Sequence, residues 1–155
     1  MIIHVIAVGK KMPNWVDQGV DEYIRRMPAE CEVKIIELPL GQRSKSKNIK
    51  QAMQQEEKSI LAAIPKNAYV IALDVQGKAW STEVLSEKIL QWMNLGKDIA
   101  LLVGGPDGMT QNCIKMAQEK WSLSNLTLPH PLVRIVLAEQ LYRALMITKH
   151  HPYHK

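Results

Sequence analysis

The feature that most restricts the fold of this chain is a series of short, continuously apolar runs, separated by longer segments with helical periodicity. Three such runs, Met1–Val8, Ala68–Leu73 and Asp98–Val103, and the more mixed run Val33–Leu38 are each followed by a glycine, a proline or an aspartate. A strand that is apolar along its whole length is typical of a sheet covered on both faces. We therefore expect an α/β fold with a mostly parallel sheet flanked by helices, forming a single domain over residues 1–155.

The segments between the runs have the spacing and the end signals of helices. Val16, Val20 and Ile24 follow one another at intervals of four, which places them on one face of a helix. Gly77 predicts a turn directly after the third apolar run. The expected helices are Trp15–Arg26, Ile49–Ala63 with a charged outer face, Ser81–Asn94, Thr110–Gln118 and Leu132–Thr148, and Trp121–Ser124 is a candidate fifth strand.

Composition and cysteine usage indicate a moderately basic protein of a reducing compartment. A net charge of +5 favours contact with a polyanion, although a protein with ordinary surface lysines would show the same value. Cys31 and Cys113 are isolated and have no metal-binding spacing, which favours a cytoplasmic location over a disulfide scaffold. Residues 1–9 are too short for a membrane span and have no basic run before them, so we expect neither a signal peptide nor a membrane protein.

Two features follow the ends of neighbouring apolar runs, where parallel sheets bind their ligands. One is Leu73-Asp74, and the other is Gly104-Gly105-Pro106-Asp107-Gly108, called the glycine loop below. Adjacent glycines let a ligand approach the backbone and expose amide donors. The spacing fits neither a Walker loop nor a dinucleotide fingerprint, so phosphate binding is weakly supported, and a tight connection without a ligand is the alternative.

Residues 121–131, Trp-Ser-Leu-Ser-Asn-Leu-Thr-Leu-Pro-His-Pro, form a less ordinary segment. Hydroxyl residues alternate with leucines, and two prolines then fix the backbone. Such a loop can offer apolar walls and backbone polar groups to a flat ring. The alternative is an irregular connection whose leucines only fill the core.

The expected last helix is apolar on several faces, which indicates either a subunit interface or a deep core within one chain. Glu139 and Arg143 are spaced to form an ion pair, while Arg143 could instead face RNA or a developing anion. The tail after it carries three histidines and Tyr153. Two of those histidines are adjacent and no carboxylate or cysteine accompanies them, so we expect no metal site.

Several long motifs, in the same order along the chain, resemble the RlmH family of the SPOUT methyltransferase superfamily. They are Ala-Val-Gly-Lys-Lys-Met-Pro at 7–13, the glycine loop, Trp-Ser-Leu-Ser at 121–124, Leu-Thr-Leu-Pro-His-Pro-Leu-Val-Arg at 126–134, and His-Pro-Tyr-His at 151–154.

The resemblance implies an enzyme that uses S-adenosylmethionine to methylate N3 of a pseudouridine in large-subunit (23S) ribosomal RNA, on the assembled ribosome. It also implies a homodimer and a trefoil knot in the C-terminal part of the chain. By this resemblance the catalytic candidates are Arg143, Tyr153 and His154, with no metal required. The expected cofactor-binding residues are Leu73, Gly104, Gly105, Leu123, Ser124, Asn125, Leu126, Thr127 and Leu128.

Two other classes of protein are alternatives to this interpretation. A ribosome-docking module would use the basic surface without catalysis, and it would not bind S-adenosylmethionine. A nucleotide-dependent enzyme would use the glycine loop for phosphate. The residues after that loop include no Lys-Ser or Lys-Thr pair, which argues against the second class.

Overall fold

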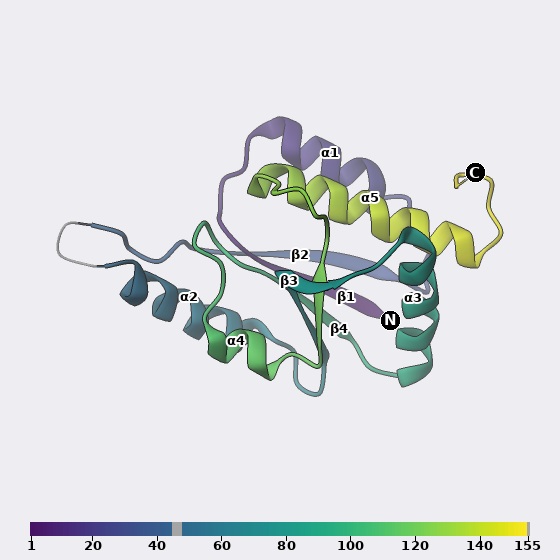
Figure 1. The fold of residues 1–155 in the computed structure, drawn as a ribbon. Coiled ribbons are helices and arrows are strands. Elements are labelled where there is room, and N and C mark those ends of the chain that lie inside the picture. The colour runs from purple at the N-terminus through teal and green to yellow at the C-terminus, as the bar shows by residue number, and fades with distance from the viewer. Residues whose placement is uncertain (45–47, 155) are drawn as a thin grey trace.

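The computed structural model describes residues 1–44 and 48–154, and in these residues strands alternate with helices (Figure 1). The elements are β1 (Ile2–Val8), α1 (Asn14–Ile24), β2 (Glu32–Leu38), α2 (Ile49–Ala63), β3 (Tyr69–Ala79), α3 (Thr82–Leu95), β4 (Ile99–Val103), α4 (Gln111–Met116), β5 (Glu119–Ser122) and α5 (His130–Thr148).

The strands form one sheet in the order β2-β1-β4-β3-β5, and every neighbouring pair is parallel. This confirms the predicted α/β class. Because all the strands run in the same direction, their carboxyl ends lie along one edge of the sheet. The segments that follow β1, β3, β4 and β5 therefore meet at that edge.

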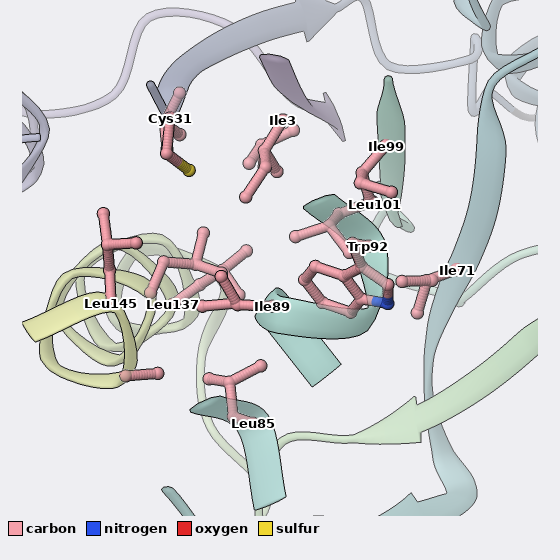
Figure 2. Close-up of a cluster of buried hydrophobic side chains, with 14 of the residues drawn as sticks. Ile3, Cys31, Ile71, Leu85, Ile89, Trp92, Ile99, Leu101, Leu137 and Leu145 are labelled. Carbon is pink, nitrogen blue, oxygen red and sulfur yellow. The ribbon is translucent and has the colours of Figure 1, made fainter. Parts of the chain in front are cut away.

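The runs that form β1 and β4 are buried on both faces of the sheet, as their composition predicted, whereas the edge strand β2 exposes Glu32, Lys34 and Glu37. Ile3 and Val5 of β1 pack on one face, while Ile6 and Val8 pack on the other. The first face carries α3 and α5, and Figure 2 shows their side chains turned toward the strands. The second face carries α2 and α4, which contribute Ile60 and Cys113 to the smaller core.

The third strand differs from its predicted form. The prediction that it ends before a turn at Gly77 was wrong, because β3 continues to Ala79. Its pairing with Trp121 of β5 shifts between Leu73 and Lys78, so residues 74–77 form a bulge at the carboxyl edge. A Cβ at Gly77 would lie 2.7 Å from the Trp121 nitrogen, so glycine is needed there for close backbone approach.

Several helix ends match their sequence signals. Ser81 and Thr110 cap α3 and α4 by accepting hydrogen bonds from Val84 and Cys113, and Gly96 ends α3 in the left-handed conformation. Helix α5 begins two residues earlier than predicted. Pro129 precedes it and Pro131 lies in its first turn, where the missing N–H costs no helical hydrogen bond.

Helix α5 is surrounded largely by its own chain. It packs on the sheet and lies between α1 and α3, and its buried side chains include Leu137, Leu141 and Leu145. Leu132, near its start, remains 40% exposed. Much of the helix's apolar character is therefore explained by core packing within one chain.

In residues 1–44 and 48–154, no helix is long and apolar enough to cross a membrane. The same residues include no group of three or more His, Cys, Asp or Glu side chains placed to hold a metal ion. Cys31 and Cys113 are buried free thiols, and burial raises the pKa of both.

Candidate functional site

A cavity of about 470 Å³ lies at the carboxyl edge of the sheet. Its floor comes from the ends of β3, β4 and β5, and its walls come from the glycine loop and from residues 123–128, called the leucine loop below. A volume of this size suits a cofactor-sized ligand. The position is the one that the parallel sheet predicts for a ligand.

Eight of the nine residues expected to bind the cofactor line this cavity. They are Leu73, Gly104, Gly105, Leu123, Ser124, Leu126, Thr127 and Leu128. Asn125 is not among the lining residues and is exposed to solvent. Segments separated by fifty residues of sequence therefore meet at one site.

The leucine loop offers an apolar wall held by local hydrogen bonds. The Ser124 hydroxyl accepts a hydrogen bond from the Leu126 N–H at 2.9 Å, and the Ser122 hydroxyl donates to the Ser124 carbonyl at 3.2 Å. Leu126 is 73% exposed although it lines the cavity. An uncovered leucine in a hollow of this kind is suited to packing on a flat apolar ring.

The glycine loop is a tight turn that tolerates no side chain at Gly104. The Gly108 N–H donates to the Gly105 carbonyl at 3.0 Å, and Gly108 has a φ of 79°. A Cβ at Gly104 would lie 2.9 Å from the Gly108 carbonyl carbon. A Cβ at Gly105 would meet Glu56 and Val8 at 3.1 Å. Substitution at Gly105 would therefore disturb buried packing as well as the cavity.

A network of charged residues around the buried Glu56 of α2 contacts the glycine loop. Glu56 of α2 is only 3% exposed, and its carboxylate accepts hydrogen bonds from the Gly41 N–H and the Arg43 guanidinium, both at 2.8 Å. Arg43 also donates to Asp107 of the glycine loop at 3.0 Å. This helix was predicted to have a charged outer face, which says nothing of the charged Glu56 on its buried face. Its spacing between Ala52 and Ile60, both buried, was the available signal.

A buried arginine of α5 contacts a residue that lines the cavity. Arg134 is 3% exposed and contacts His130, which lines the cavity. Neither residue was predicted as part of the site. Their motif, Leu-Pro-His-Pro-Leu-Val-Arg, was noted in the sequence, but only the preceding leucines were assigned a role.

The three catalytic candidates cluster with one another near the end of α5. Arg143 forms the expected ion pair with Glu139, and its guanidinium lies 4.8 Å from the centre of the Tyr153 ring. The Tyr153 hydroxyl donates to Glu139 at 3.1 Å. His154 lies 3.3 Å from an Arg143 nitrogen and 3.1 Å from Glu83.

The environment of this cluster defines the charge of two members. Burial and the neighbouring Glu139 raise the pKa of Tyr153 to about 12, so its hydroxyl keeps its proton at neutral pH. Hydrogen bonding to Glu139 raises the pKa of Arg143, which stays cationic. Both residues can therefore donate hydrogen bonds, and neither can act as a base.

The cluster does not line the cavity of its own chain. Arg143 follows His130 by thirteen residues on α5, which is about 20 Å at the usual helical rise. In Figure 1 the start of α5 and the C terminus lie at opposite ends of that helix. One chain thus brings the predicted cofactor residues together at one place and the predicted catalytic residues together at another.

Comparison with known proteins agrees with this architecture. A family model described as predicted SPOUT methyltransferase matches residues 1–154. Together with the parallel sheet and the cavity at its edge, the match defines the chain as a SPOUT methyltransferase.

The chain belongs to the RlmH family of these enzymes. It is 53% identical to ribosomal RNA large subunit methyltransferase H of Saccharophagus degradans, over the full length of both chains. It is 47% identical to the protein of the same name from Methylococcus capsulatus, again over both full lengths.

Two solved structures share the fold at low sequence identity. A probable methylase family protein from Haemophilus influenzae matches 99% of this chain and 70% of its own, with a TM-score of 0.53 and 11% identity. A structure described as giving insight into 2-OH methylation of C/U34 on tRNA matches 94% of this chain and 97% of its own, with a TM-score of 0.52 and 18% identity. At these identities the likeness supports the fold alone.

Proposed function

We propose that this chain is a methyltransferase that uses S-adenosylmethionine to methylate N3 of a pseudouridine in large-subunit ribosomal RNA. The observation that carries the proposal is the cavity between the glycine loop and the leucine loop, in a chain of the RlmH family. The name of the relatives supports the RNA class, and the family resemblance supports the base and the atom. The cytoplasm is the proposed place of action, because ribosomes are there.

The lining residues fit an adenosyl ligand. Leu126 and Leu128 would cover the faces of the adenine ring, while backbone groups of the leucine loop would bond its edge. The backbone of the glycine loop would contact the sugar and the amino-acid part of the cofactor. When bound, the cofactor supplies a methyl group already activated by its sulfonium, so the protein must mainly align the acceptor nitrogen with it.

The acceptor N3 must lose a proton, and the tail cluster is suited to help. Arg143 is a fixed cation that favours the anionic form of the base. Tyr153 keeps its proton and can donate to a base carbonyl or stack on the ring. Imidazole is the side chain that exchanges protons most readily near neutral pH, so His154 is the proposed proton acceptor.

A homodimer would join the two groups of residues that one chain keeps apart. The tail of one copy would lie over the cavity of the other, beside a neighbouring hollow of about 400 Å³ lined by Trp80, Leu85, Val136 and Gln140. Light scattering should give twice the chain mass at low micromolar concentration. A monomer that retains full activity at that concentration would contradict this arrangement. The family's trefoil knot and the single-domain organisation stay predictions alongside it.

The substrate test compares assembled ribosomes with a protein-free transcript of the same RNA. A chain of 155 residues with a net charge of +5 has little surface for a sequence reader of its own. We expect methyl transfer from labelled S-adenosylmethionine to ribosomes to exceed transfer to naked RNA by about a hundredfold or more, since phosphate contacts position a protein without specifying a base. Mass spectrometry of the product should place the methyl on a pseudouridine. Equal rates on both substrates would contradict the ribosome proposal.

Replacing Leu126 by alanine should weaken S-adenosylmethionine binding by about tenfold, the effect of removing roughly 60 Å² of apolar contact. Because this side chain is 73% exposed in the free protein, the free energy of unfolding should change little. Calorimetric titration measures the affinity. Leu61→Ala on α2 is the matched control, since Leu61 is 41% exposed and does not line the cavity. Equal losses in both variants would remove the leucine loop from the cofactor site.

A further inference from the structure

The segment that joins β1 to α1 presents two lysines and a tryptophan to solvent. Lys10 and Lys11 are exposed, and Trp15, in the first turn of α1, is 53% exposed. Within residues 1–44 and 48–154, neither lysine has an ion-pair partner and no aromatic ring packs on Trp15. The proposed reaction gives no role to these three side chains, which are called the Lys-Lys-Trp surface below.

The Lys-Lys-Trp surface begins beside the glycine loop. Strands β1 and β4 are parallel neighbours, so the residues that follow them leave the sheet at the same edge. Val8 ends β1, and a Cβ at Gly105 would lie 3.1 Å from its side chain. Lys10 is two residues further along the chain. The first lysine therefore lies near the rim of the cavity that Gly105 lines.

A buried arginine fixes the residue before Lys10. Arg134 is 3% exposed, and its guanidinium donates to the Gly9 carbonyl at 2.6 Å and to His130 at 2.9 Å. His130 lines the cavity, so one side chain connects the start of the segment to the cavity wall. Because a buried arginine is costly to separate from its partners, the backbone that presents Lys10 is held in place.

Trp15 lies at the same end of the molecule as the cavity wall. Figure 1 shows α1 and α5 side by side, and both helices begin on the same side. A Cβ at Gly19 of α1 would lie 2.9 Å from the Ile135 side chain of α5. Trp15 is about one turn before Gly19, and Pro131 is about one turn before Ile135. The tryptophan is therefore near the first turn of α5, which includes His130.

Two acidic side chains of this edge are already paired with other cations. Glu37 of β2 accepts from Arg134, and Asp107 of the glycine loop accepts from Arg43 at 3.0 Å. Asp17 lies in the first turn of α1 but forms no ion pair with either lysine. The two lysines therefore keep their charges available for an anionic partner.

We propose that the Lys-Lys-Trp surface holds the ribosomal RNA substrate beside the cavity, with Lys10 and Lys11 on phosphates and the Trp15 indole stacked on an unpaired base. The inference rests on the proposed function, since it names where the RNA that enters that site is held. Unpaired surface lysines attract phosphates and release counterions from them. An exposed aromatic ring is a platform on which the bases of single-stranded RNA stack.

The backbone at Lys11 supports a role for its side chain. Lys11 has a φ of 59°, in the left-handed region that a residue with a Cβ rarely adopts. Glycine would adopt this conformation without strain, so the backbone alone does not explain a lysine here. We therefore expect Lys11→Gly to be at least as stable as the wild type in urea unfolding, although it binds RNA more weakly.

A second copy of this chain is the alternative partner for an exposed tryptophan. Two unpaired cations would be costly to bury between subunits, and charged residues are depleted from the centres of protein interfaces. The same charges favour binding to RNA. We expect Trp15→Ala to have the same mass as the wild type in light scattering at low micromolar concentration. A lower mass would assign Trp15 to a subunit contact and overturn its role in RNA binding.

Lysines at the opposite edge of the sheet provide a matched control. Lys66 follows α2 and Lys97 precedes β4, and both are exposed and without an ion pair in the described part of the chain. The test variant combines Lys10→Ala with Lys11→Gly, and the control variant combines Lys66→Ala with Lys97→Ala. Each loses two positive charges, so the net charge of the protein is the same in both. Thermal unfolding verifies that both are folded.

Pelleting with assembled ribosomes at several salt concentrations measures RNA binding. The logarithm of affinity falls with the logarithm of salt concentration, by about 0.7 to 0.9 for each phosphate neutralised. We expect the test variant to reduce this slope by about 1.5 and to bind about tenfold more weakly, whereas the control variant should match the wild type. Neither Lys10 nor Lys11 lines the cavity, so calorimetry should give an unchanged affinity for S-adenosylmethionine.

Trp15 should have a different signature in the same measurement. Trp15→Ala should weaken binding by about tenfold, the usual effect of losing one stacked base, and should leave the salt slope unchanged. Trp15→Phe keeps an aromatic ring and should bind within about threefold of the wild type. Leu90→Ala is the control, since Leu90 of α3 is 49% exposed and lies outside the segment. In methyl transfer the losses should appear as a higher KM for ribosomes with an unchanged kcat.

The outcomes separate this surface from the proposed function. Equal losses in the test and control lysine variants would overturn the inference. So would weaker binding of the test variant at an unchanged salt slope, because the lysines would then contact something other than phosphates. A folded wild-type protein that transfers no methyl group to ribosomes would defeat the proposed function, whereas the pelleting measurement supports or overturns the surface by itself.

Discussion

Deletion of Pro152–Lys155 should lower the single-turnover rate of methyl transfer by about a thousandfold or more, while S-adenosylmethionine still binds within about threefold of wild type. Lys155 lies outside the described residues. The deleted segment also includes Tyr153 and His154. Loss of a positioned proton acceptor and donor typically costs two to four orders of magnitude in rate, roughly 10²–10⁴-fold. The cavity of the same chain has no lining residue from the tail, so its affinity should survive.

The deletion also has a cost in stability that the sequence did not suggest. Terminal residues of a domain ordinarily contribute little to its core. In the structure the Tyr153 ring lies 4.8 Å from the Tyr142 ring and packs against the larger core, and its hydroxyl bonds Glu139. These contacts together should contribute about 1–2 kcal/mol. Urea unfolding measures the loss, and turnover should be compared at a temperature where both proteins are fully folded.

Single substitutions divide the tail's roles. Tyr153→Phe removes the bond to Glu139 and should lower the rate modestly, whereas Tyr153→Ala also removes the ring and should lower it further. His154→Ala should give the largest loss and should change the pH profile of the rate, because it removes the proposed proton acceptor. A deletion variant with the full wild-type rate would exclude both residues from the active site.

The separation of cavity and tail makes mixed dimers informative. A chain without its tail and a chain with a cofactor site blocked by substitution are each expected to be inactive as homodimers. If the tail of one copy serves the cavity of the other, the mixed dimer regains one working site. If each chain serves itself, mixing restores nothing. The experiment therefore tests the composite site independently of any single residue.

Much of the fold was predictable because the apolar runs are unambiguous. Ile3 and Val5 point to one face of the strand and Ile6 and Val8 to the other, so all four can be buried only if both faces are covered. The structure confirms this, because the two pairs belong to two different core clusters. The location of the cavity followed from the rule that parallel strands present their ligands at the carboxyl ends. The leucine loop could be noticed in the sequence. That it lines the same cavity as Leu73 could not be predicted, because the periodicity of the sequence carries no information about long-range contacts.

The features that were missed depend on contacts between distant segments. The bulge at residues 74–77 exists because β3 pairs with Trp121 on both sides of it. Glu56 looks like a surface residue in a charged helix, and only its place on the Ala52–Ile60 face indicates burial. Arg134 and His130 are one turn apart, but the other partners of Arg134 are distant in sequence: Gly9 follows β1, and Glu37 belongs to β2. Local sequence patterns carry no information about such partners.

Replacement of Arg43 by methionine should lower the free energy of unfolding by about 3 kcal/mol or more. Among the described residues Glu56 would then keep the Gly41 N–H alone as partner for a carboxylate that is 97% removed from solvent, and an unpaired buried charge costs roughly 3–5 kcal/mol. That is a large part of the roughly 5–15 kcal/mol that holds a domain of this size folded. The loss of the Arg43–Asp107 bond should also loosen the glycine loop and weaken cofactor binding.

Two comparisons separate burial of the charge from mere loss of an arginine. Arg25→Met removes an ion pair with Glu22 in which the arginine is 67% exposed and the glutamate 39% exposed, so it should cost less than about 1 kcal/mol. In the double variant Arg43→Met with Glu56→Gln, the neutral amide oxygen still accepts from Gly41, and part of the lost stability should return. Urea unfolding of the four proteins, wild type included, gives each value. If Arg43→Met costs no more than Arg25→Met, or if the double variant is less stable than Arg43→Met alone, the buried charge is not what makes Arg43 necessary. If the expected order holds, Gly41 and Arg43 are held against α2 by electrostatics rather than by apolar packing, and the bond from Arg43 to Asp107 helps to fix the glycine loop.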